Sequence, residues 1–393
     1  MIQSIYIRCT KNNKMLESLV TKVKEHFPNR KTSCLKNVLL LSLCLLHKET
    51  VNLNKLKKCV SLFTKKSSKA DSSYKRLLRI FDDYSRGKLW IQLLRYVFQI
   101  LRLRTTHLII DGTSWKRGKR WFHYMTLSVV YQGVSIPIYW KDISKHGHSN
   151  VYERICLIKQ ALKHYNLAGK ILLADREYIG KDWFNDLIDN QIDFIIRIKK
   201  TDYKGLIDQF TGLSHKAMTK KVLKSTIHQK AISKLIEIQG MSLQFVAVKN
   251  PKNDKKDPVI YLLTNLVELP AKSVAQDYCI RTKIEQCFKH LKSNGFDLEQ
   301  LNLRTKSRCR LLMAITVFTY VLSINEGLKT YKQVPCKTYA DGSIEKAKSV
   351  FRHGFDRLAN LCKCFKDFCN YICSQIDMAM SKYRSPLCIL SSS

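Results

Sequence analysis

The order of strand-like and helix-like segments between residues 106 and 198 constrains the fold most strongly. Three segments rich in β-branched and aromatic residues come first, and two helical segments follow, each with a short apolar strand after it. The seven segments are 106–111, 122–131, 134–140, 152–165, 170–175, 181–190 and 193–198. Gln132 and Gly133 supply a hairpin turn between the second and third strands. Antiparallel hairpins followed by alternating helices and strands predict a mixed α/β sheet.

Residues 1–104 have the pattern of a helical domain. Apolar residues recur at three- and four-residue spacing in four segments, namely 15–23, 35–46, 51–63 and 89–101. Residues 1–105 contain 23 basic and 6 acidic side chains, a balance of +17. We therefore expect a basic DNA-binding region here, and the ordinary alternative is a set of solvated helix faces.

The pattern changes again after residue 200. Residues 201–265 alternate short strand-like runs with polar loops, so a β-rich insertion is expected within a domain of residues 105–330. A long helix is expected near Val274, and further helices from Ser307 to the C-terminus. Residues 331–393 form the predicted C-terminal helical region. One helical face of this region is either a dimer contact or a surface that packs back onto the catalytic domain: Phe351, Phe355, Leu358, Cys362, Phe365 and Cys369.

The net charge limits the class of partner. The chain has 69 Lys and Arg residues against 31 Asp and Glu residues, a formal charge of +38. An excess of this size attracts polyanions, so nucleic acid is the first partner to consider. Hydrophobic residues make up 45% of the chain, which excludes wholesale disorder. Charge alone does not distinguish a protein that binds DNA from one that cuts it.

Membrane, secreted and zinc-binding proteins fit the sequence poorly. The longest apolar run, residues 311–324, is shorter than the roughly 20 residues that span a bilayer, so we expect a buried helix. We see no secretory signal, and the 14 dispersed cysteines indicate free thiols in a reducing cytoplasm. The cluster of Cys362, Cys364, Cys369 and Cys373 lacks the spacing of zinc ligands, so small apolar residues on a helix are the simpler interpretation.

Two aspartates stand out because they follow apolar strands in a basic chain. Asp111 closes the run LII, and Asp175 closes the run ILLA. Side chains at the carboxyl ends of strands emerge at the rim of an α/β sheet, where ligands bind. Hard divalent cations prefer carboxylate oxygen, so two such aspartates on nearby strands are candidate metal ligands. Taken singly, each is also a common turn former or helix cap.

A third acidic residue lies in a stripe of unusual composition. Tyr278, Arg281, Glu285 and Lys292 follow the pattern Y-x2-R-x3-E-x6-K. At about 100° per residue they lie within an arc of about 60° on an α-helix, and Lys289 joins the same face. A helix face with one acidic, one aromatic and three basic side chains is not one that packs into a hydrophobic core. The stripe predicts a metal-binding carboxylate flanked by cations that hold phosphates.

These motifs resemble the DDE transposases of the insertion-sequence 4 family over about residues 70–330. The stripe matches the family signature in full, and the segments DGT at Asp111, ADRE around Asp175, FIIRIK and LLTNL are also similar. The resemblance implies a ribonuclease H-like mixed sheet with a β-rich insertion, preceded by a helical N-terminal domain and followed by C-terminal helices. One residue departs from the family pattern. Thr282 stands where the family usually has an aromatic side chain. The inserted region also lacks a Trp, and in the best-known members a Trp in that region supports the flipped base of a DNA hairpin.

The resemblance also implies a mechanism. Asp111, Asp175 and Glu285 would form the catalytic triad and bind two Mg²⁺ (or Mn²⁺) ions. The implied reaction is cleavage at the ends of an insertion element, followed by transfer of the 3′-hydroxyl into target DNA. The side chains assigned to DNA phosphates are Tyr278, Arg281, Lys289 and Lys292.

The expected partners follow from this reaction. They are the terminal inverted repeats of the element, the target DNA and a second copy of the chain, because two DNA ends must be brought together. The expected location is a bacterial cytoplasm, at the nucleoid when DNA is bound. Two alternatives stay open: a ribonuclease H-like nuclease or resolvase without strand transfer, and an inactive transposase derivative that only binds DNA.

Overall fold

The chain forms two compact units. The structure is a computed structural model, and the residues that it describes are 16–25, 27–64, 69–101, 105–143, 145, 147–199, 217, 220, 231–238, 240–250, 258–340 and 342–381. One unit, called the helical unit below, combines Met1–Leu103 with Phe288–Cys388. The other, called the sheet unit, is Arg104–Cys287. The sheet unit therefore ends at residue 287, whereas the sequence predicted a domain that extends to residue 330.

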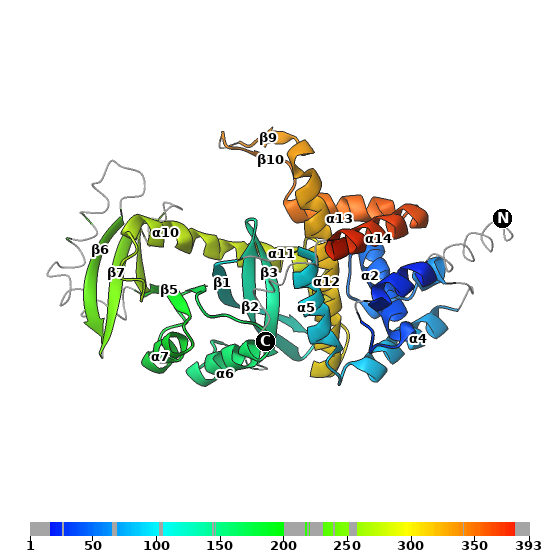
Figure 1. Ribbon diagram of the computed structural model, residues 1–393, viewed down its shortest axis with the longest axis horizontal. Coiled ribbons are helices and arrows are strands. Elements are labelled where there is room, and N and C mark those ends of the chain that lie inside the picture. Colours follow the sequence, from blue (N-terminus) through cyan, green and yellow to red (C-terminus); the bar gives the residue numbers. More distant parts are fainter. Residues whose placement is uncertain are drawn as a thin grey trace. The chain divides into compact units, whose positions relative to one another are not determined.

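The sheet unit contains a mixed sheet with the strand order β3-β2-β1-β4-β5-β8-β7-β6 (Figure 1). β1 runs parallel to β4 and β4 parallel to β5, and the remaining neighbours are antiparallel. The order β3-β2-β1-β4-β5, with β2 reversed, is the ribonuclease H-like arrangement, so the predicted fold class is confirmed. The strands are β1 His107–Arg117, β2 Arg120–Tyr131, β3 Val134–Asp142, β4 Ile171–Ala174, β5 Asp193–Ile198, β6 Ala231–Ile238, β7 Met241–Lys249 and β8 Val259–Thr264.

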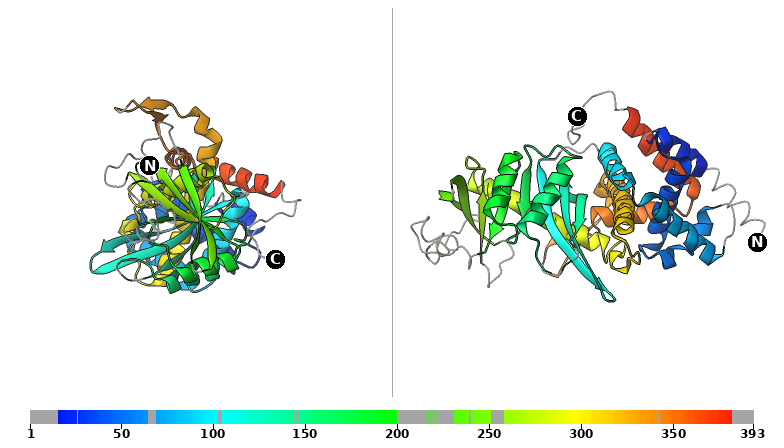
Figure 2. Two further views of the ribbon diagram at one scale, coloured as in Figure 1. Left: turned by 90° about the vertical axis from the view of Figure 1, so that its left-hand side faces the viewer. Right: turned by 90° about the horizontal axis from the view of Figure 1, so that it is seen from below.

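Helices cover both faces of this sheet. α6 (Val151–Leu162) and α7 (Lys181–Asp189) lie on one side and α10 (Ala271–Cys279) on the other (Figure 1). All seven segments predicted between residues 106 and 198 are present as strands or helices. The strands are rotated relative to one another, which gives the twist expected of a mixed sheet (Figure 2).

The predicted β-rich insertion extends the main sheet. Its three predicted strands are β6, β7 and β8, and β8 pairs with β5. The Asn265 side chain fixes this junction: its Oδ1 accepts from the Phe194 N–H at 2.9 Å, and its Nδ2 donates to Asp193 Oδ1 at 2.8 Å. Of residues 200–230, only 217 and 220 are among those described. The described strands thus form one continuous layer with the ribonuclease H-like core.

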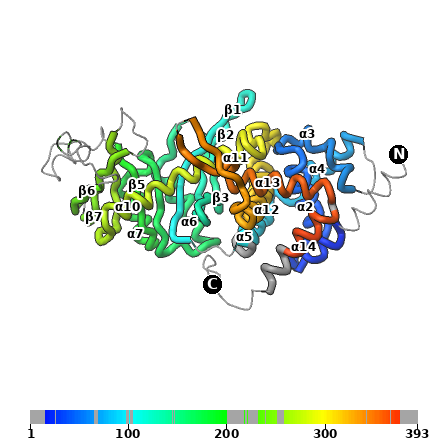
Figure 3. Tube along the Cα trace, turned by 90° about the horizontal axis from the view of Figure 1, so that it is seen from above, coloured from blue at the N-terminus to red at the C-terminus, as the bar shows by residue number. Residues whose placement is uncertain are grey.

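The helical unit is built around α12, which packs against α13, α5 and α2 (Figures 1 and 3). Besides helical residues 16–25, its elements are α2 Thr32–Lys48, α3 Leu53–Leu56, η1 Val60–Phe63, α4 Ala70–Tyr84, α5 Leu89–Leu101, η3 Leu298–Gln300, α12 Lys306–Thr330, η4 Tyr331–Gln333, β9 Cys336–Thr338, β10 Ile344–Lys346, α13 Val350–Leu361 and α14 Phe365–Ser381. Among the described residues, one helical stretch, Lys306–Gln333, is long and apolar enough to cross a membrane. However, 89% of its most apolar window is buried inside the protein, as expected for a core helix.

Two predictions for the helical unit are wrong in detail. The segment 51–63 is not one helix but the short α3 followed by η1, and a β9–β10 hairpin interrupts the predicted C-terminal helices. A break between α13 and α14 divides the face proposed for dimer contact. Five of its six residues are buried within the chain, and the Phe365 side chain lies outside the described part. The buried five, which are therefore not an open dimer surface, are Phe351, Phe355, Leu358, Cys362 and Cys369.

Glycine allows α12 and α13 to approach closely. A Cβ atom at Gly354 would lie 1.9 Å from the Ser323 carbonyl oxygen, and one at Gly327 would lie 2.0 Å from the Val350 carbonyl oxygen. Both obstacles are backbone atoms, so a side chain at either position requires the helices to move apart. The crossing of the two helices therefore depends on these glycines.

We expect Gly354→Ala to destabilise the protein by about 2–3 kcal/mol, because the added methyl group forces two packed helices apart. Gly87→Ala is the matched control: a Cβ there meets only one atom, at an ordinary 3.8 Å, and its φ is not positive. Urea unfolding followed by circular dichroism measures both. Equal free energies of unfolding for the two variants would contradict the close crossing.

Candidate active site

Strand register places Asp111 beside Asp175. β1 and β4 pair in parallel with a constant offset of 64 residues, as in His107↔Ile171, Leu108↔Leu172 and Ile109↔Leu173. The two aspartates have the same offset (175 − 111 = 64), so they lie just past the last pair on adjacent strands. β4 ends at Ala174, one residue before the predicted end at Asp175. β1 does not end at Asp111 but continues to Arg117 in a hairpin with β2, so the predicted end of that strand is wrong.

Backbone amides orient both aspartates in the same way. The Gly112 N–H donates to Asp111 Oδ1 at 2.8 Å, and the Arg176 N–H donates to Asp175 Oδ1 at 2.8 Å. Each hydrogen bond fixes one carboxylate oxygen and leaves Oδ2 for another partner. The two strands therefore present a matched pair of carboxylate oxygens.

Arg281 contacts all three carboxylates of the predicted triad. Its Nη1 lies 3.3 Å from Asp111 Oδ2, and its Nη2 lies 4.0 Å from Asp175 Oδ2 and 2.6 Å from Glu285 Oε1. Arg281 belongs to a 3-10 turn, η2 (Ile280–Thr282), and Glu285 to the following helix α11 (Lys283–Leu291). The structure thus brings Asp111, Asp175 and Glu285 around one guanidinium group.

The cluster is partly closed to solvent. The side chain of Arg281 is 11% exposed, and exposure rises along the carboxylates from 20% at Asp111 to 31% at Asp175 and 42% at Glu285. The cluster is therefore most open to solvent at Glu285, the carboxylate on α11.

Burial and charge shift the pKa values of this cluster. Burial raises the pKa of the Asp111 carboxyl to about 6, although Arg281 and the Gly112 N–H oppose the rise. For Arg281, burial alone lowers the pKa, but the attraction of Tyr278, Asp175, Asp111 and Glu285 outweighs it, and the pKa is raised. Burial also raises the pKa of the Tyr278 phenol. Burial and the neighbouring charges therefore act in opposite directions on the pKa of Asp111 and on that of Arg281.

The signature residues do not lie on one continuous helix, as the sequence predicted. The expected single helix is α10, the 3-10 turn and α11 in succession, and Tyr278 at the end of α10 is only 7% exposed. Lys289 and Lys292 belong to the helical unit. Lys289 is exposed, and Lys292 Nζ lies 3.7 Å from Glu299 Oε1. The contact of these two lysines with DNA stays a prediction.

The donor set suits a hard divalent cation, but its spacing is that of an ion-pair cluster. Carboxylate oxygen is the ligand that Mg²⁺ and Mn²⁺ prefer. In the described part of the chain, however, no three His, Cys, Asp or Glu side chains lie close enough together to hold one ion. Asp111, Asp175 and Glu285 surround a guanidinium that occupies the position between them. The chemistry of the residues therefore fits a metal, provided that Arg281 releases their oxygens.

The contacts that hold the loop after Asp175 were not predicted from the sequence. Arg154 on α6 is 5% exposed; its Nη2 donates to the Ser149 carbonyl oxygen at 2.6 Å and its Nη1 to the Ile179 carbonyl oxygen at 3.3 Å. His148 Nδ1 lies 2.6 Å from Glu177 Oε2. In the sequence Arg154 looks like part of a polar helix face, and no short-range pattern pairs His148 with a residue 29 positions away.

Comparison with known proteins identifies the family. A family model described as "Transposase DDE domain" matches residues 102–322, which is more than half of the chain. The chain belongs to this DDE transposase family. Domains of the family generally use divalent metal ions and act on DNA.

The other comparisons are less specific. No curated protein matches the chain. Among solved structures, one similar chain comes from a cryo-EM structure of a piggyBac transposase synaptic complex with hairpin DNA. It is 12% identical, with a TM-score of 0.42, over 97% of this chain and 82% of that one.

We expect Arg281→Gln to lower the stability of the metal-free transposase by about 2 kcal/mol, because three neighbouring carboxylates lose their shared cation. Added Mg²⁺ should then raise the Tm of the variant more than that of the wild type, since Arg281 no longer competes for the same oxygens. Differential scanning calorimetry with and without Mg²⁺ measures both effects. A variant that Mg²⁺ stabilises no more than the wild type would count against metal binding by these oxygens.

Proposed function

We propose that the protein is a cut-and-paste DNA transposase of the insertion-sequence 4 group. It cleaves DNA at the ends of an insertion element and joins the free 3′-hydroxyl to target DNA. One observation carries the proposal: carboxylate oxygens of Asp111, Asp175 and Glu285 converge on a single guanidinium. The match of the family model supports the chemistry, and the full Y-x2-R-x3-E-x6-K signature supports the group.

The same three carboxylates are the proposed ligands of two Mg²⁺ or Mn²⁺ ions. Such ions, when bound, supply an activated water or 3′-hydroxyl and stabilise the leaving oxygen at phosphorus. The Gly112 and Arg176 amides hold Oδ1 of each aspartate, so the orientation of the carboxylates does not depend on the ions. Because a covalent protein–DNA intermediate is not needed, we assign no nucleophilic side chain.

Arg281 has two successive roles in this proposal. Without metal it pairs with the three carboxylates and offsets part of their charge, and bound metal would leave its guanidinium free to bind a DNA phosphate. Tyr278, which is buried near it, stays a proposed DNA contact. Lys289 and Lys292 are the other proposed phosphate contacts, and exposed Lys289 is the more accessible of the two.

The proposed partners are the terminal inverted repeats of the element, the target DNA and a second copy of the chain. Joining two element ends in one reaction requires two catalytic triads to act together, which favours a homodimer on DNA. The buried face of α13 and α14 does not supply the dimer contact, so another surface has to. The proposed location is the bacterial cytoplasm, at the nucleoid.

We expect Glu285→Gln to lower the rate of Mg²⁺-dependent cleavage by at least about a hundredfold, because a neutral amide is a poor ligand for a hard cation. The substrate is a DNA end that carries the inverted repeat flanking the gene. Glu268→Gln is the matched control, since it makes the same chemical change at an exposed position in the sheet unit. Cleavage that is equally fast in both variants would refute the assignment of Glu285.

A second assay separates the alternatives. A pre-cut end with a free 3′-hydroxyl is incubated with target plasmid and Mg²⁺, and joined products are scored. A transposase joins the two DNAs, whereas a ribonuclease H-like nuclease or resolvase cuts without joining. An inactive derivative binds the end and does neither.

A further inference from the structure

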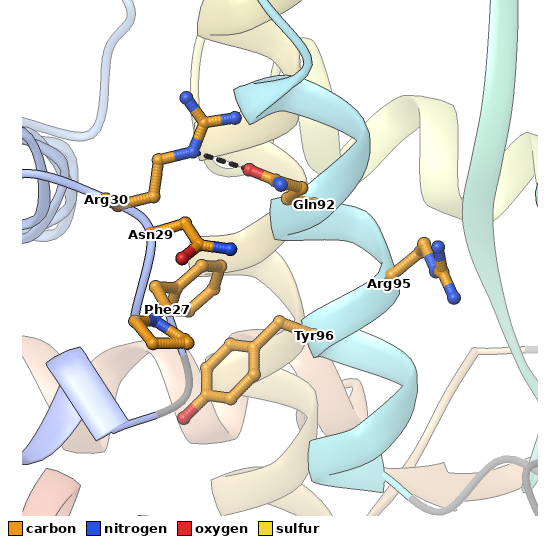
Figure 4. A pocket seen from close by; sticks show the side chains of 7 residues that line it. Phe27, Asn29, Arg30, Gln92, Arg95 and Tyr96 are labelled. Atoms are coloured by element: carbon orange, nitrogen blue, oxygen red, sulfur yellow. Dashed lines mark hydrogen bonds between the residues drawn. The ribbon is translucent and has the colours of Figure 1, made fainter.

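A polar pocket of about 160 Å³ lies in the helical unit (Figure 4). It is far larger than the roughly 10–15 Å³ that one water molecule needs. The loop between helical residues 16–25 and α2 forms one side, and α5 forms the other. Its lining residues are Phe27, Pro28, Asn29, Arg30, Gln92, Arg95 and Tyr96.

The pocket presents hydrogen-bond donors and no carboxylate. Among the described residues, the two terminal nitrogens of Arg30 and the amide nitrogens of Asn29 and Gln92 have no hydrogen-bond partner, and none of the seven lining residues is acidic. Arg95 is exposed and points to the other side of α5, so it adds positive charge near the pocket but not inside it (Figure 4). Such a set of donors favours an anion.

The Arg30 side chain is held in a defined orientation. Its Nε donates to Gln92 Oε1 at 2.6 Å, which leaves the two terminal nitrogens free to bind an anion as a fork. The loop that carries Arg30 is fixed by Lys24, whose Nζ donates to the carbonyl oxygens of Pro28, at 2.7 Å, and of Arg30. The ring of Phe27 packs edge-on against Tyr96 at 5.0 Å between ring centres. An orientation prepared in this way suits a planar, bidentate contact with phosphate oxygens.

We propose that this pocket binds a backbone phosphate of DNA, with Arg30 as the bidentate donor and Asn29 and Gln92 as neutral donors beside it. This site is separate from the carboxylate cluster of the sheet unit, and the proposal rests on the proposed function, because that function makes DNA the anion. The excess of basic residues in residues 1–105 favours the same ligand. The pocket anchors the DNA independently of base sequence and takes no part in the chemistry.

Arg30→Gln tests the site by removing the fork. A short fluorescein-labelled duplex of arbitrary sequence is titrated by anisotropy at several salt concentrations. We expect affinity to fall on the order of tenfold, and the slope of log K against log salt to decrease by about 0.9, which corresponds to one lost phosphate contact. Arg86→Gln is the matched control: Arg86 is exposed and has no ion pair or hydrogen bond among the described residues. It should change both quantities much less.

Gln92→Glu tests the same site without removing Arg30. The near-isosteric carboxylate would pair with the guanidinium and repel phosphate, so affinity should fall as it does for Arg30→Gln, with an unchanged circular dichroism spectrum. A parallel titration with inorganic phosphate distinguishes the sources of the anion. If phosphate at millimolar concentration raises the Tm of the wild type but DNA affinity is the same in Arg30→Gln and Arg86→Gln, the pocket takes free phosphate and the proposal is overturned.

The outcomes for the pocket and for the function are separable. If wild-type protein binds the duplex but Arg30→Gln, Gln92→Glu and Arg86→Gln bind it equally, the pocket proposal fails while cleavage by the triad is untouched. If the wild type cleaves no element end yet Arg30→Gln loses a phosphate contact, the pocket stands and the transposase proposal fails.

Discussion

The contact of one guanidinium with three carboxylates is the interaction on which the site depends. Three carboxylates against Arg281 leave a formal charge of −2 at this point of a chain whose net charge is +38. Burial is the main cause of the raised pKa of Asp111, because the charged form of the carboxyl is less stable away from water. A residual negative charge on partly buried oxygens is what divalent cations neutralise, so the incomplete compensation by Arg281 is itself an argument for metal binding.

Short-range features of the fold were predictable from the sequence. β5 spans residues 193–198 as expected, because an apolar, β-branched run bounded by polar residues has few alternatives. The turn at Gln132 and Gly133, with φ values of 46° and 75°, follows from residues that tolerate this backbone conformation. Long-range pairing was not predictable. β1 extends past Asp111 because Trp115 stacks on Phe122 across the β1–β2 hairpin. The run LIID contains no pattern that predicts this contact.

At the site, too, short-range contacts were predictable from the sequence and long-range contacts were not. The contact of Arg281 with Glu285 follows from their spacing of four residues, which survives the 3-10 turn. The approach of Asp111 to Asp175 depends on a register between parallel strands that are separated by two other strands and a helix in sequence. Arg281 was expected to hold phosphate, but a pattern on one helix cannot reveal that its guanidinium faces carboxylates from two strands. Residue types were therefore readable from the sequence, whereas their partners required the fold.

Two sites of opposite chemistry follow from where the few acidic residues lie. In the sheet unit, carboxylates gather and require cations; in the helical unit, the pocket at Arg30 presents several donors and no carboxylate, which suits an anion. DNA satisfies the second requirement directly, because every nucleotide carries a phosphate. It meets the first only through bound cations, since its phosphates would otherwise be repelled by the triad. In the proposed function, generic positive charge therefore holds DNA anywhere along its length, whereas a phosphate would approach the carboxylate cluster only together with bound cations, which would restrict cleavage to that cluster.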